Sequence, residues 1–416
     1  MASINVKSIR VQGVSVSVEF DTTADIAQFF KSDRFRIEYD IDISAVPPSI
    51  AIIPFVCNVL PIIWLTDAEL CLPCLDKSFL DSIPDFKQGY IDMYPMFDFK
   101  GCLRVADVVE NKHEGTRSAA FFSGGLDAYA TLVAHIDESP ILLTLRGSDV
   151  SLDDVEGWEN VSRPIKQAAR EYHLDYHFVT TTFRTFIDEA NLSQLVAVSK
   201  DGWWHGFQHG IGIIGHAAPL CHMEGVRILY IASSFTPADK GKYTCASDIT
   251  IDSHVRFAST HVVHDQYEYS AQQKAQHVCE FVRRTGHKVY MHVCWQSKDG
   301  KNCCRCEKCY RRLMAIVAEG EDPNDYGFNM DAAAYKRMKR DMLVKLSLNK
   351  SIHWKKIQQR CIENKANIHI KGIDWIYTVD FDKFNNLPIK RFYRLLKKIQ
   401  SRLRLRTRFK KLFIRR

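Results

Sequence analysis

Four cysteines near residue 300 have the spacing of metal ligands. Cys294, Cys303, Cys306 and Cys309 form the pattern C-x8-C-x2-C-x2-C. Four thiolates at this spacing can close a tetrahedral zinc site, with the two short spacers forming a tight knuckle. Such a site has no open coordination position, so we expect a structural role. An iron–sulfur cluster is the chemical alternative, and Cys304 is an alternative ligand.

A glycine-rich segment, Ser123-Gly-Gly-Leu-Asp127, has the composition of a phosphate-binding loop. It lies between an apolar run at 119–122, expected to be a strand, and a helical stretch at 126–135. Helix N-termini attract anions, and glycines let the backbone approach phosphate oxygens closely. No lysine follows, so this is not a Walker A loop. A plain strand-to-helix turn is the structural alternative. The expected ligand residues are Ser123, Gly124, Gly125, Leu126 and Asp127, and Asp127 is also expected to act in catalysis.

Other polar residues in the same region are weaker candidates. Ser233 and Ser234 end an expected strand, where parallel sheets bind ligands. Lys274, early in a helical stretch, could pair with phosphate and act in catalysis. Asp248 and Asp252 could hold Mg²⁺, which prefers oxygen ligands. A simple strand end, a solvated lysine and surface turns are the structural alternatives.

Histidines occur in two pairs. His205 and His209 lie four residues apart in 203–210 and could bind metal from one helix face, but no third ligand is apparent. A packed helix is the favoured interpretation. His261 and His264 could act as acid or base, since histidine titrates near neutrality; a structural role is again favoured.

These candidates need a framework of alternating strands and helices, which is typical of a parallel sheet flanked by helices. The fold class expected is therefore α/β. Strands are expected at 119–122, 140–145, 176–179, 226–232 and 288–293. Helices are expected at 126–135, 164–172, 203–220 and 269–284.

The N-terminal part is expected to be rich in strands, because 14–20 and 35–43 alternate apolar and polar residues. Residues 44–66 contain no charged side chain but hold four prolines. Prolines this dense break a helix, so we expect two short buried strands here, 50–53 and 59–65, rather than a membrane span.

Charge is concentrated at the C-terminus. The 416 residues carry +7, yet residues 387–416 alone contain 13 Lys or Arg and no acid, so residues 1–386 carry −6. Ile389, Phe392, Leu396, Ile399 and Leu403 follow helical spacing, which predicts one apolar and one cationic face. Such a helix suits an anionic membrane surface or, less well, RNA phosphate; a solvated tail is the alternative.

We therefore expect a strand-rich domain at 1–115, an α/β domain at 116–322 and a basic helical extension at 323–416. There are 13 cysteines. We expect no secretory signal, because the first 20 residues contain no continuous apolar run. We expect a reduced, cytoplasmic protein with free thiols or a metal site. If the basic tail binds a membrane, the protein is expected to be peripheral at the inner face of that membrane. Cys71 and Cys74 form a lone C-x-x-C, taken as two partly buried cysteines.

The two main motifs occur together in one family. The SGGLD loop resembles the pyrophosphate loop SGGxDS of the PP-loop ATP pyrophosphatases, with Ala128 in place of the last serine. Residues 117–320, including the cysteine spacing, resemble the 7-cyano-7-deazaguanine synthases of that family. About 115 residues before this region and 95 after it have no counterpart there. Such chains are closer to longer, divergent relatives, some found with polysaccharide gene clusters or antiphage systems.

The resemblance implies an adenine-nucleotide alpha hydrolase fold, similar to a Rossmann fold. It also implies that ATP and Mg²⁺ adenylate a carboxyl or carbonyl oxygen, releasing pyrophosphate before a nitrogen nucleophile attacks. Two alternatives remain: a nucleotide-binding adaptor that has lost the chemistry, favoured by Ala128, and a tRNA-modifying enzyme that holds RNA through its tail. A homodimer is a further expectation.

Overall fold

The computed structural model describes residues 2–294, 296, 301–348, 351–397 and 399. The chain divides into two compact units, Met1–Ser270 and Ala271–Arg416. The expected domain boundaries near residues 115 and 322 fall inside these units and stay predictions.

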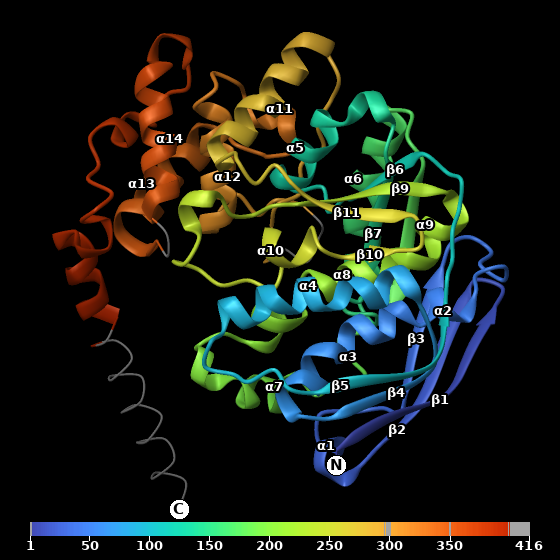
Figure 1. Ribbon diagram of the computed structural model, residues 1–416. Helices are drawn as coiled ribbons and strands as arrows, with labels where there is room; N and C mark the ends of the chain where they lie inside the picture. Colours follow the sequence, from blue (N-terminus) through green and yellow to red (C-terminus); the bar gives the residue numbers. More distant parts are fainter. Residues whose placement is uncertain (1, 295, 297–300, 349–350, 398, 400–416) are drawn as a thin grey trace, which may run out of the picture. The chain divides into compact units, whose positions relative to one another are not determined.

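The first unit is a mixed α/β structure in which one mostly parallel sheet is flanked by helices (Figure 1). Among the described residues the sheet has 11 strands in the order β10-β11-β9-β6-β7-β8-β3-β2-β1-β4-β5. The strands are β1 (Ser3–Gln12), β2 (Ser15–Thr22), β3 (Arg34–Tyr39), β4 (Glu69–Asp76), β5 (Cys102–Val109), β6 (Arg117–Phe121), β7 (Ile141–Arg146), β8 (Tyr176–Thr181), β9 (Val226–Ala232), β10 (Arg256–Phe257) and β11 (Thr260–Asp265). The α-helices are α1 (Ala24–Ala27), α2 (Pro48–Ala51), α3 (Ile53–Thr66), α4 (Lys77–Met93), α5 (Leu126–Ala134), α6 (Val155–Glu171), α7 (Glu189–Leu195), α8 (Ile211–Ile214), α9 (Ala218–Glu224) and α10 (Ile249–Asp252).

The expected strand-rich N-terminal part is present as β1–β5, but it does not form a separate sheet. Strand β3 pairs antiparallel with β8, with Glu38 opposite Thr180, and this pairing joins the two halves of the sheet. One hydrophobic core extends across both halves, from Ile4 on β1 to Val262 on β11. The N-terminal strands are therefore part of the framework that supports the α/β half.

The order of the parallel strands reverses beside β6. From β6 the chain moves through β7 to β8 on one side, and it later returns to place β9 on the other side of β6. In open α/β sheets, ligands bind at the carboxyl ends of the strands at such a reversal. The loops that follow β6 and β9 are therefore the first places to look for a site.

Residues 48–51 and 53–66 form the helices α2 and α3, so the prediction of two short strands was wrong. Pro54 lies in the first turn of α3, where a missing N–H has no cost. Pro61 lies inside the helix, but the side chains of 53–64 are all buried, and this burial outweighs proline's cost. The Asn58 side chain donates a hydrogen bond of 2.8 Å to the Pro54 carbonyl. This bond links the first turn of α3 to the next turn of the helix. None of the described helices is long and apolar enough to cross a membrane.

The helix expected at 203–220 is interrupted. A π-helix, η3 (Trp204–Gln208), is followed by α8, a 3-10 turn η4 (Gly215–Ala217) and α9. The break falls at Gly210, whose φ of +82° is one that side-chain-bearing residues rarely adopt. Because of the interruption, the two histidines of this segment do not lie on one face of a regular α-helix: His205 lies in η3 and His209 follows its end.

The regular elements described in the second unit are helices, as expected for the chain beyond residue 324. Its helices are α11 (Ala271–Thr285), α12 (Glu307–Val317), η6 (Pro323–Tyr326), α13 (Ala332–Arg340), η7 (Asp341–Lys345), α14 (Ser351–Glu363), η8 (Lys365–Asn367), η9 (Asp374–Tyr377) and η10 (Phe384–Asn386). Residues 388–397 are also helical.

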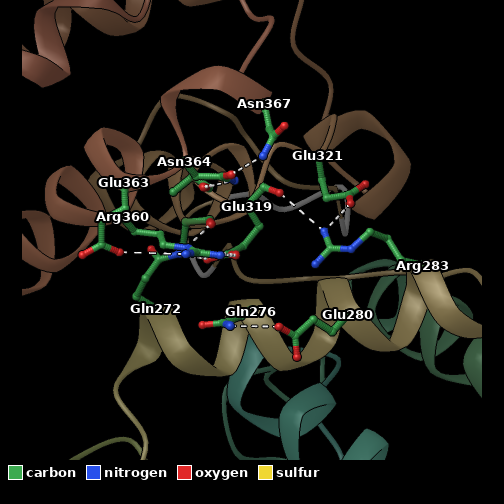
Figure 2. A network of polar contacts seen from close by, with 12 residues as sticks. Gln272, Gln276, Glu280, Arg283, Glu319, Glu321, Arg360, Glu363, Asn364 and Asn367 are labelled. Atoms are coloured by element: carbon green, nitrogen blue, oxygen red, sulfur yellow. Dashed lines mark hydrogen bonds and ion pairs between the residues drawn. The ribbon is translucent and has the colours of Figure 1, made fainter.

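A buried ion pair holds three of these helices together (Figure 2). The Glu319 carboxylate, just after α12, is wholly buried. The Arg360 guanidinium of α14 donates to both of its oxygens, with nitrogen–oxygen distances of 2.6–3.0 Å. The Gln272 side chain of α11 donates to the same carboxylate at 2.8 Å. Helix α14, which belongs to the expected extension, is thus integral to this unit.

Residues 288–293 are not a strand, so that prediction was also wrong. The Met291 N–H donates to the Tyr326 carbonyl at 3.2 Å. Two other backbone groups bond to the Asn302 side chain: Val293 N–H donates to Asn302 Oδ1 at 2.9 Å, and Met291 C=O accepts from Nδ2 at 2.7 Å. The same amide nitrogen donates to the Gly327 carbonyl at 2.9 Å. One buried asparagine therefore fixes three segments around the cysteine loop.

Candidate functional site

The glycine-rich loop joins β6 to α5, as the sequence predicts. Gly124 has a φ of +72°, which lets the chain turn sharply between strand and helix. Gly125 is the N-cap residue of α5 and has no side chain to cap the helix. Asp127 lies in the first turn, and Ser123 is exposed beside it. The loop thus has the geometry of an anion site at a helix N-terminus.

Two residues of the loop point into the protein. Leu126 and Ala128 are buried, with exposed fractions of 1% and 5%. Leu126 can therefore meet a ligand only through its backbone. Ala128 occupies a packed position, so the hydroxyl that the resemblance implies there is replaced by a methyl group in the core.

Ser233 and Ser234 lie at the same edge of the sheet as this loop. Strands β6 and β9 are parallel, with Ala120 opposite Tyr230, so their carboxyl ends lie side by side. The Ser233 hydroxyl donates to the Phe235 carbonyl at 2.7 Å, which stabilises the turn after β9. Ser234 is exposed. The strand reversal therefore brings the loop and the two serines to one edge.

Lys274 lies on α11 in the second unit, and its side chain is buried. The solvated helix lysine considered as its structural alternative is therefore wrong. The catalytic role expected for it stays a prediction.

The two aspartates considered for Mg²⁺ have structural partners. Asp248 caps α10, accepting from the Thr250 N–H at 3.0 Å. Asp252 is wholly buried and binds His264 Nδ1 at 2.9 Å and the Ser247 hydroxyl at 2.7 Å. His264 is thus held in a buried pair, in agreement with the favoured structural role.

The four cysteines of the second motif converge. The sulfurs of Cys294, Cys303, Cys306 and Cys309 all lie within 4.8 Å of one another. The Cys303 and Cys309 sulfurs are 3.8 Å apart, which is the edge of a tetrahedron, about 3.8 Å, around a zinc ion with Zn–S bonds of about 2.3 Å. The cluster can therefore bind a metal ion, and the donor set fits one.

Hydrogen bonds within the loop and at the start of α12 position the cysteines of this cluster. Cys306 is the N-cap of α12, and its sulfur accepts the N–H of Cys309. The side-chain hydrogen bond with Cys309 lowers the pKa of Cys306, which favours the thiolate that metal binding needs. Cys304 is not part of the group: its sulfur accepts the Asn329 N–H instead. Asn302, which sequence reasoning missed, holds the loop in place.

Cys71 and Cys74 lie on β4 and are partly buried, as expected. Burial raises the pKa of both thiols, so neither resembles an activated redox cysteine.

In comparisons with known proteins, no protein-family model matches the chain, and no curated protein matches it.

Proposed function

We propose that the chain is an ATP pyrophosphatase of the PP-loop type with an adenine-nucleotide alpha hydrolase fold. The proposal rests on one observation: a Ser-Gly-Gly-Leu-Asp loop joins strand to helix where the parallel strand order reverses. A ligand is expected at this edge on fold grounds. The loop's glycines and helix N-terminus suit the phosphates of ATP.

Each residue of the loop then has a role. The amides of Gly124, Gly125 and the first turn of α5 bind the β- and γ-phosphates. Asp127 holds Mg²⁺, whose charge offsets that developing on the leaving pyrophosphate. The serines after β9 contact the nucleotide from the neighbouring strand. A carboxyl or carbonyl oxygen of the substrate attacks the α-phosphorus, and a nitrogen nucleophile then displaces AMP.

The metal cluster has a separate, structural role in this proposal. Four cysteine ligands around zinc leave no position for substrate. Zinc would hold Cys294 and Cys303 against Cys306 and Cys309 at the start of α12.

The test is to identify the nucleotide products. Full-length protein is incubated with Mg-ATP and a deproteinised cell extract, and the nucleotides are separated by chromatography. We expect AMP and pyrophosphate, with a rate at least about a hundredfold lower in Asp127→Asn. Asp137→Asn, in the turn after α5, is the matched control and should keep the wild-type rate. Production of ADP and phosphate alone would contradict the proposal, and ATP binding without turnover would favour the adaptor.

We propose a second function for the C-terminal helix, binding to an anionic membrane surface. Residues 388–397 are helical, and Ile389, Phe392, Leu396 and Ile399 are between 47% and 61% exposed, as the apolar spacing predicts. Leu403 lies outside the described residues. Exposed aliphatic and aromatic side chains beside Arg391 and Arg394 suit a lipid interface better than RNA.

The membrane proposal is tested by co-sedimentation with lipid vesicles. The wild-type protein should pellet with vesicles containing phosphatidylserine and not with phosphatidylcholine alone. Phe392→Asp with Leu396→Asp should lose this binding, whereas Val198→Asp, at an equally exposed apolar residue of the first unit, should keep it. Salt-sensitive tRNA binding without vesicle binding would instead support the RNA alternative.

A further inference from the structure

A buried thiol in the first unit lies between two histidines. The Cys245 sulfur is 3.6 Å from His209 Nδ1, and His205 also interacts electrostatically with this thiol. Cys245 is 6% exposed, while the His205 side chain is 51% exposed, so the cluster lies just beneath the surface. These are the two histidines for which the sequence offered no third partner.

An aspartate orients the more exposed histidine. Asp201 Oδ1 binds His205 Nδ1 at 2.9 Å. Its other oxygen accepts the Tyr94 hydroxyl at 2.9 Å and the Thr244 hydroxyl at 2.6 Å. The aspartate and this histidine are therefore hydrogen-bonded to each other, and the histidine interacts electrostatically with the cysteine. This order of nucleophile, base and orienting group is the arrangement used in nucleophilic catalysis.

Two glycines allow the close packing of this cluster. A Cβ on Gly206 would lie 2.6 Å from the Tyr94 hydroxyl, and one on Gly210 would lie 2.4 Å from the Ala246 carbonyl. The Ala246 N–H donates to the His205 carbonyl at 2.9 Å, which ties the cysteine's segment to the π-helix. Such π-helical turns are frequent at functional sites.

A second, independent observation is a buried polar atom beside His209. Asp252 is wholly buried, and its Oδ1 has no hydrogen-bond partner among the described residues. A Cβ on Gly210, the residue after His209, would lie 2.7 Å from this oxygen. An unpaired buried carboxylate oxygen is costly. Burial lowers the pKa of His209, but the hydrogen bond with Cys245, the charge of Cys245 and, after these, the charge of Asp252 outweigh it, so the pKa is raised.

The electrostatics favour the thiolate. Burial alone would raise the pKa of Cys245, but hydrogen bonds with His205 and His209 lower it to about 6. Asp201 raises the pKa of His205 to about 10, with a further contribution from Cys245. The titratable groups that interact with this cluster are Tyr90, Tyr94, Asp149, Asp201, His205, His209 and Asp252. Both histidines therefore favour the thiolate form of Cys245, and the thiol in turn raises the pKa of each histidine.

One residue that follows a strand at the edge carrying the glycine-rich loop interacts with this cluster. Asp149, which interacts electrostatically with His209, follows the carboxyl end of β7. Strand β7 is parallel to β6 and adjacent to it. Ligands of α/β sheets bind at this edge.

We propose that Cys245, His205 and Asp201 form a second reactive site, in which Cys245 accepts acyl groups from activated carboxyl compounds as a thioester. The thiolate sulfur forms a bond to the acyl carbon, and the bond from that carbon to the leaving oxygen breaks. The leaving oxygen takes the electron pair, and a protonated histidine supplies a proton where the leaving group needs one. Asp201 is a positioning residue, because it acts through His205.

The probe is p-nitrophenyl acetate, used on the full chain without ATP, so the result is independent of the proposed ATP chemistry. The acetyl group is located by peptide mass spectrometry after brief exposure. We expect Cys245 to be acetylated first, with a rate that is half-maximal near pH 6. Cys102, which is exposed, serves as the ordinary thiol in the same sample.

Variants separate catalysis from folding. His205→Asn and Asp201→Asn should move the half-maximal pH upward and slow acetylation at pH 6.5 about tenfold or more, because less thiolate remains. Cys221→Ser, at another buried thiol of this unit, should change neither the half-maximal pH nor the rate of acetylation. Circular dichroism checks that each variant is folded. Acetylation of Cys102 with Cys245 untouched, or an unchanged pH profile in His205→Asn, would overturn the proposal.

Discussion

Replacing Cys309 with serine is expected to remove bound metal from the protein and to destabilise the second unit by several kcal/mol. Cys309 is wholly buried, and its N–H also bonds to the sulfur of Cys306 at the start of α12. Binding free energies of structural zinc sites reach about 10–16 kcal/mol in small domains, and this energy contributes to folding. Serine preserves the size of the side chain but cannot supply a thiolate, so the site loses one of its four ligands.

The measurement is metal content by elemental analysis together with thermal unfolding. Wild-type protein should hold one equivalent of zinc, and Cys309→Ser well under half of that with a lower Tm. Cys304→Ser is the matched control, because Cys304 lies in the same loop but outside the group of four. Visible absorbance and iron in place of zinc would show the iron–sulfur alternative. Equal metal content in the two variants would refute the assigned ligand set.

The elements around the glycine-rich loop could be predicted because the local signals agree. Apolar residues followed by two glycines and a helical pattern predict the strand and helix that the structure has as β6 and α5. The short cysteine spacers can close only a tight loop, so their convergence follows from chain length. In both cases the residues that decide the structure are neighbours in sequence.

The predictions were wrong where residues distant in the sequence determine the local structure. Residues 53–64 form a helix despite Pro61 because the fold buries every one of these side chains, which a local rule cannot foresee. Residues 288–293 have the composition of a strand, but the Asn302 side chain bonds to Val293 N–H and Met291 C=O, and the Tyr326 carbonyl accepts Met291 N–H. Cys245 is the partner that His205 and His209 lacked, and it lies at least 36 residues from either in the sequence. Only the tertiary structure places these three together.

Replacing Arg360 with alanine is expected to lower the free energy of unfolding of the second unit by about 3–5 kcal/mol, because it leaves a buried carboxylate without its counter-ion. Glu319 is wholly buried, and Arg360 contacts both of its oxygens (Figure 2). The Gln272 amide that remains supplies one neutral hydrogen bond and no charge. Arg360→Lys should be intermediate, since lysine cannot bind both oxygens with a planar fork.

The neighbouring pair provides the control. Arg283 and Glu321 are 2.6 Å apart, but the arginine side chain is 44% exposed, so Arg283→Ala should cost less than about 1 kcal/mol. Chemical denaturation of both variants, read at the far-ultraviolet helix signal, gives the comparison. Adding Glu319→Gln to Arg360→Ala should recover part of the loss, because the uncompensated charge is then gone. Equal losses for the two arginines would mean that the ion pair does not hold α14 to α11 and α12.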